Sequence, residues 1–76
     1  MARKIKITVV SGIHGDYYAV KEEGQPTRPF GCWMQKELKE YIKGAEVEWV
    51  KGRNFFKGEP VSDSLYNSMV EGVTGA

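Results

Sequence analysis

Residues 51–58 hold the side chains of this sequence that are best suited to binding. The segment places two adjacent phenylalanines among three cations, namely Lys51, Arg53, Phe55, Phe56 and Lys57. Consecutive side chains of a strand point to opposite faces, so a thin sheet cannot easily bury both rings. We therefore predict that one of the two phenylalanines lies at the surface beside the cations, as part of a contact patch.

Two kinds of partner fit such a patch. Aromatic rings stack on unpaired bases while neighbouring cations hold phosphates, which is how many proteins bind single-stranded nucleic acid. Aromatic residues and arginine are also frequent anchors of protein interfaces. A third interpretation is structural, in which the rings complete a small core and the lysines and glycines form its wet rim. All three interpretations remain open at the level of the sequence.

Cys32 and His14 are the only cysteine and the only histidine of the chain. Cys32 lies close to the start of a predicted helix, where a helix N-terminus would stabilise a thiolate, and His14 would have to serve as its base. Nothing in their spacing brings the two together. Free cysteine is among the most frequently buried residues. We therefore interpret Cys32 as a small core residue and predict no catalytic residue and no enzyme.

Metal and cofactor sites are not predicted either. One cysteine and one histidine cannot complete a structural zinc site. Residues 11–16 combine Ser, Gly, His and Asp, but they lack the phosphate-loop pattern and are typical of a turn. Glu46 and Glu48 would lie about 7 Å apart on one strand face, which we interpret as a solvated surface. The prediction is no metal ligand and no cofactor.

Length and charge restrict the class of protein. The 76 residues predict one domain, residues 1–76. The 11 basic and 10 acidic residues give a formal charge of +1, whereas dedicated DNA-binding modules gain affinity from a strong cationic excess. A domain this small is only marginally stable, and with one cysteine it has no internal disulfide. A homodimer is one remaining way to gain stability, and we keep it as an alternative.

The chain has the features of a cytoplasmic protein without a membrane span. No apolar run approaches the roughly 20 residues that a membrane helix needs. The start of the chain is charged, and Lys6 interrupts the apolar run that a signal peptide would require. A free cysteine without an export signal fits a reducing compartment. We predict a cytoplasmic location and no membrane association.

Hydrophobic periodicity predicts the elements. Alternation over residues 4–10 indicates a strand with Ile5, Ile7 and Val9 on one face. Further strands are predicted at 17–20 and 46–50, and a short fourth strand at 55–57. Residues 22–29 are predicted to be a loop because they contain Gly and Pro. Apolar residues at three- and four-residue steps predict a helix over 30–43 that ends at Gly44.

The resulting fold class is a small α+β domain with the order β-β-α-β-(β)-α. Its sheet is predicted to be antiparallel with the strand order 2-1-3-(4), and the amphipathic helix covers one face. A short C-terminal helix, capped by Ser62 or Asp63, covers the same face or docks on a partner. A helical connection makes the strands that it joins parallel, so the second and third predicted strands run in the same direction.

These observations predict a small non-enzymatic binding module. It would act through protein–protein contact, as an inhibitor or regulatory subunit, using the patch around residues 51–58. The partner would be another protein or a second copy of the chain. The alternative is binding of single-stranded RNA or DNA by the same residues. The solvent exposure of Phe55 and Phe56 is the observation that discriminates most between a patch and a core.

Overall fold

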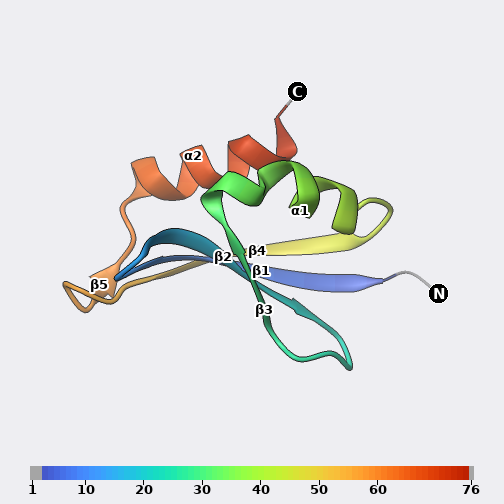
Figure 1. Cartoon of the computed structure of the whole chain (residues 1–76), viewed down its shortest axis with the longest axis horizontal. Helices are drawn as coiled ribbons and strands as arrows, with labels where there is room; N and C mark the ends of the chain where they lie inside the picture. Colours follow the sequence, from blue (N-terminus) through green and yellow to red (C-terminus); the bar gives the residue numbers. More distant parts are fainter. Residues whose placement is uncertain (1–2, 76) are drawn as a thin grey trace.

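The computed structural model describes residues 3–75, which form a mixed five-stranded sheet with two α-helices on one of its faces (Figure 1). In chain order the elements are β1 (Lys4–Gly12), β2 (Gly15–Glu22), β3 (Arg28–Gly31), the 3₁₀ turn η1 (Cys32–Met34), α1 (Gln35–Tyr41), β4 (Glu46–Asn54), β5 (Glu59–Pro60) and α2 (Asp63–Thr74). The predicted α+β class is confirmed. The C-terminal helix packs on the same face as α1, one of the two predicted arrangements.

The sheet has the strand order β3-β2-β1-β4-β5. β1 pairs antiparallel with β2 and parallel with β4, so the prediction of an antiparallel sheet is wrong at this pair. The cause is β3, which pairs antiparallel with β2 and reverses the chain once more. The helical crossover therefore starts from β3 and not from β2, and a crossover makes the strands that it joins parallel. The predicted order 2-1-3 of the first three strands is retained within the longer sheet.

β3 begins in the last two residues of the predicted loop, 28 and 29, and ends in the first two residues of the predicted helix, 30 and 31. Phe30 is opposite Tyr18 in the register with β2, and Pro29 is opposite Ala19. Proline lacks the N–H that an inner strand needs, and β3 is the edge strand of the sheet, where that loss is tolerated. The pairing of Phe30 with Tyr18 of β2 overrides the local helical pattern. The predicted helix over 30–43 is therefore shortened to η1 and α1.

The core lies between the sheet and the two helices. Ile5, Ile7 and Val9 face the helices as predicted and are 0–2 % exposed. Their neighbours in the core are Tyr18, Val20, Phe30, Leu38, Val61, Met69 and Val73. Gly44 follows α1 with φ +80°, the left-handed conformation predicted for the end of this helix. Among residues 3–75, no helix covers the opposite face of the sheet (Figure 1).

Neither α1 nor α2, nor any other helix within residues 3–75, has the length and apolarity needed to cross a membrane.

Candidate functional site

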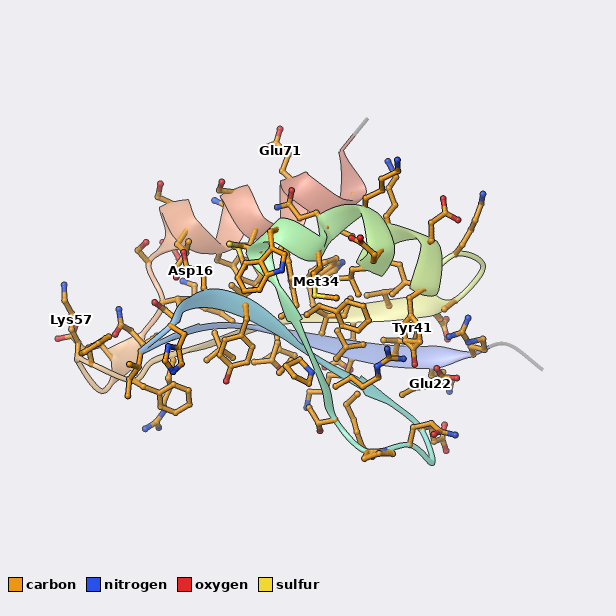
Figure 2. The ribbon with its side chains drawn as sticks, viewed as in Figure 1. Asp16, Glu22, Met34, Tyr41, Lys57 and Glu71 are labelled. Carbon is orange, nitrogen blue, oxygen red and sulfur yellow. The ribbon has the colours of Figure 1, made fainter. Side chains whose placement is uncertain are left out.

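Three loops meet at one end of the sheet and enclose an apolar groove of about 720 Å³. They are the β1–β2 turn, the η1 turn that follows β3, and the β4–β5 turn. The side chains of Ile13, His14, Tyr17, Trp33, Met34 and Phe55 line it. We call this hollow the tip groove. Figure 2 shows Lys57 at the far end of the molecule, with Asp16 and Met34 inward of it.

The β4–β5 turn presents both phenylalanines to solvent. Residues 55–57, predicted to be a strand, form a turn, and β5 begins only at Glu59. The side chain of Asn54 accepts hydrogen bonds from the backbone N–H groups of Phe56 and Lys57 at 3.0 and 3.3 Å. An asparagine side chain that accepts hydrogen bonds from the N–H groups two and three residues later favours a turn over a strand. The prediction of a strand over residues 55–57 is wrong because the Asn54 side chain takes the backbone N–H groups that a strand would pair.

Gly58 completes the turn. Its φ of +66° is left-handed, and its N–H donates to the carbonyl of Asn54 at 2.8 Å. As a result Phe55 is 64 % exposed and Phe56 is 72 % exposed. The sequence predicted one ring at the surface, and the structure places both there. The interpretation in which both rings complete the core is therefore wrong.

Phe55 is held against the end of β1. Its N–H donates to the carbonyl of Ser11 at 2.9 Å. Gly12 lies between the ring edges of Phe55 and Tyr17, since a Cβ on this glycine would be 3.9 Å from the first ring and 3.4 Å from the second. Phe55 thus forms a wall of the tip groove, and the exposed Phe56 follows it directly in the chain.

Trp33 and Ile13 are functional candidates that the sequence did not single out. Each is 76 % exposed, and both line the tip groove. The helix predicted over 30–43 would place Trp33 on its apolar stripe, but Trp33 lies in η1 with its ring over Gly31. A Cβ on Gly31 would come within 2.6 Å of that ring, so only glycine leaves room for it. For Ile13 a signal did exist, because a large apolar residue inside a Gly-bounded turn has no core to enter.

The three cations of the predicted patch differ in whether they form an ion pair. Lys51 forms an ion pair with Asp63 at the start of α2, and this hydrogen bond lowers the pKa of the Asp63 carboxyl. Arg53 and Lys57 are exposed at the end of β4 and in the turn that follows it. Arg53 and Lys57 therefore remain available to bind a partner, whereas the charge of Lys51 is balanced by Asp63.

Cys32 is exposed, so the interpretation that it is a core residue is wrong. It lies in η1, whereas His14 lies in the β1–β2 turn at the tip groove. Within residues 3–75 no group of three or more His, Cys, Asp or Glu side chains is arranged to hold a metal ion.

A second hollow, of about 420 Å³ and lined mainly by charged residues, lies over the first halves of β1 and β4. Its charged lining consists of Lys4, Lys6, Lys21, Glu23, Glu46 and Glu48. The two signs balance, and Glu46 and Glu48 are exposed, as expected for a solvated strand face. Apart from Ile5 and Val47 its lining is charged, so this hollow is much less apolar than the tip groove.

Comparison of the chain with protein-family models, with curated proteins and with solved structures finds no match.

Proposed function

We propose that the chain is a small non-enzymatic module that binds another protein through the tip groove and its apolar rim. The observation that carries the proposal is the gathering of large, exposed apolar side chains at one end of the sheet. Ile13, Trp33 and Phe55 line one hollow, and Phe56 follows directly in the chain. Single exposed apolar residues are ordinary on protein surfaces, but a contiguous group of them marks an interaction site.

The balance of charge favours a protein over a nucleic acid as the partner. The chain carries a formal charge of +1, and Lys51 is already paired with Asp63. An acidic residue, Asp16, also lines the tip groove. Nucleic acids are held mainly by cations on phosphates, whereas protein interfaces have aromatic anchors and few charges at their centre. Binding of single-stranded RNA or DNA by Arg53, Phe55, Phe56 and Lys57 is the alternative.

The proposed role is that of an inhibitor or regulatory subunit, which acts by occupying a surface of its partner. A domain of 76 residues that presents an apolar groove has the means for such contact. The exposed thiol of Cys32 supports a reducing compartment such as the cytoplasm.

Capture from a cell lysate with a matched pair of variants tests the proposal. The Phe55→Ala/Phe56→Ala double variant should lose at least about tenfold of the captured partner, as expected for two anchor residues. Because both rings are exposed, its free energy of unfolding should stay within about 0.5 kcal/mol of the parent chain. The control is Glu71→Ala, whose side chain projects away from the sheet on the outer side of α2 (Figure 2) and does not line the tip groove; it should capture normally.

Equal capture by the parent chain and the double variant would contradict the proposed site. The nucleic-acid alternative is tested with a fluorescent ten-nucleotide single strand at about 50 and 200 mM salt. We expect no saturable binding at either concentration. Binding that weakens steeply with salt and is absent in Phe55→Ala/Phe56→Ala would replace the protein partner by a nucleic acid at the same residues.

A further inference from the structure

The outer edge of β4 lacks a neighbouring strand over residues 46–51. On its inner side β4 pairs with β1 along this whole stretch. On its outer side the partners within residues 3–75 are Glu59, Pro60 and Val61, which reach only Asn54, Arg53 and Gly52. A strand with one free edge presents unpaired N–H and C=O groups to solvent.

The residues that carry these free groups follow from the ladder. The N–H of Glu46 donates to the carbonyl of Arg3 at 2.8 Å. The backbone N–H and C=O groups of Glu46 therefore point toward β1 and not toward the open edge. Backbone groups of a strand alternate in direction from one residue to the next. Val47, Trp49 and Lys51 therefore direct their N–H and C=O groups toward the open edge.

The two terminal strands of the sheet are protected against strand addition, but this part of β4 is not. β3 contains Pro29, and β5 is two residues long and contains Pro60. Short strands and prolines are the usual means by which natural sheets block their edges. Residues 46–51 contain no proline and run straight along β1. The free edge of β4 is thus the stretch of the described sheet best able to accept a strand.

The pairing of β1 with β4 shows which residue pattern this strand accepts. On the open face Lys4 and Lys6 are opposite Glu46 and Glu48, and on the helix face Ile5 and Ile7 are opposite Val47 and Trp49. β1 therefore alternates basic and apolar residues against β4. Ile5 and Ile7 have strands on both sides and are 2 % and 0 % exposed, whereas Val47 and Trp49 stay only partly buried.

We propose that residues 46–51 form a β-strand addition site for an extended segment of another protein in which basic and apolar residues alternate. The apolar side chains of that segment would cover Val47 and Trp49. Its basic side chains would lie beside Glu46 and Glu48, neither of which forms an ion pair with another described residue. The complementary pattern is the same for a parallel and an antiparallel segment, because side chains alternate between the two faces in both.

This site is separate from the tip groove, and the test distinguishes the two. The ¹⁵N-labelled chain is titrated with the peptide acetyl-Thr-Lys-Val-Lys-Val-Thr-amide and followed by NMR. We expect shifts centred on Val47, Trp49 and Lys51, slower hydrogen exchange of their amides, and a dissociation constant below about 1 mM. The same peptide with glutamate in place of lysine is the matched control and should bind at least about threefold more weakly.

Two variants complete the design. Glu46→Gln/Glu48→Gln should weaken binding of the basic peptide by about threefold to fivefold and remove its salt dependence. Phe55→Ala/Phe56→Ala should leave it unchanged, so failure at this edge and failure at the tip groove are distinguishable. Circular dichroism verifies that both variants are folded.

Three results would overturn the strand-addition site. The first is the absence of shifts at β4 with several millimolar peptide, and the second is equal binding of the glutamate peptide. The third is sedimentation as a dimer with the β4 amides already protected before peptide is added, because the edge would then belong to a second copy of the chain.

Discussion

At the residue scale, Tyr18 joins the sheet to both helices. Its ring is fully buried, and its hydroxyl donates to the carbonyl of Met69 in α2 at 2.6 Å. The same hydroxyl accepts from the side-chain amide of Gln35, in the first turn of α1, at 3.0 Å. Burial raises the pKa of the Tyr18 phenol, and the hydrogen bond from Gln35 opposes this shift. Tyr18 therefore acts as a neutral donor and acceptor at the centre of the molecule.

Removal of this hydroxyl should destabilise the fold. Tyr18→Phe leaves the Met69 carbonyl and the Gln35 amide without their partner, and we expect a loss of about 1–2 kcal/mol in the free energy of unfolding. Urea denaturation followed by circular dichroism measures it. Tyr66→Phe is the control, because the Tyr66 hydroxyl forms no hydrogen bond with another described residue, and it should change stability by less than about 0.5 kcal/mol. Equal losses in the two variants would contradict the role given to Tyr18.

At the scale of elements, the β4–β5 turn sets the geometry of the tip groove. Its conformation depends on Asn54, whose side chain accepts hydrogen bonds from the N–H groups of Phe56 and Lys57, and on Gly58, whose φ is left-handed. Ser11 anchors the turn to β1 through the N–H of Phe55. The exposed rings are therefore displayed by a turn with defined hydrogen bonds, which lowers the entropy that binding would cost.

Substitution of Gly58 tests this view of the turn. Alanine tolerates a φ of +66° poorly, so Gly58→Ala should cost about 1 kcal/mol, seen as a fall in Tm of about 4–8 °C for a domain of this size. Gly58→Asn is the matched control, because asparagine visits the left-handed region more readily, and it should lose less than half as much. If the alanine and asparagine variants unfold at the same temperature, the left-handed conformation does not determine the stability of this turn.

At the scale of the whole molecule, two exposed ion pairs tie segments that are distant in sequence. Arg3 donates to both carboxylate oxygens of Glu22, and the Tyr41 hydroxyl donates to one of them, at 2.8–3.1 Å. These hydrogen bonds lower the pKa of Glu22, with that from Arg3 the larger cause, and the Lys51 hydrogen bond lowers that of Asp63. Figure 2 shows Glu22 and Tyr41 side by side at the end opposite Lys57.

These shifts predict how stability depends on pH. The pKa values of Glu22 and Asp63 are lower in the folded chain than their ordinary values of 4.5 and 3.8. As the pH falls toward and below those ordinary values, the unfolded chain therefore binds more protons than the folded chain. The stabilisation is therefore fully present above those values and is lost as the pH falls through the folded pKa values. Urea midpoints between pH 7 and pH 2 should decrease in this acid range, and less steeply in Glu22→Gln/Asp63→Asn. Identical acid profiles for the variant and the parent chain would contradict this assignment.

The sequence alone could predict much of the fold and part of the site. The alternation in β1 identified its buried face, and Ser62 marked the start of α2, which the structure confirms. Gly44 has the predicted left-handed φ, but α1 ends earlier than predicted, at Tyr41. Asparagine is frequent in turns, so Asn54 was compatible with a turn at 55–58, but whether it forms one depends on which backbone N–H groups its side chain reaches. Four of the five residues predicted for the contact patch are exposed, as that prediction requires, and carry no ion pair with another described residue: Arg53, Phe55, Phe56 and Lys57. The fifth, Lys51, is paired with Asp63, which α2 brings to it.

The sequence by itself determined the local period of each long element and the exposure of one of the two adjacent phenylalanines. The tertiary structure decided the rest, starting with β3, whose four residues form a strand only because β2 pairs with them. That pairing moved the start of the crossover, made β4 parallel to β1, and placed Trp33 beside Ile13 and Phe55. Local patterns report how a segment repeats along the chain, whereas contacts between distant segments depend on the energy of the whole fold. For this reason a surface ring at position 55 or 56 was predictable, whereas the exposure of both rings and the groove that Phe55 borders were not.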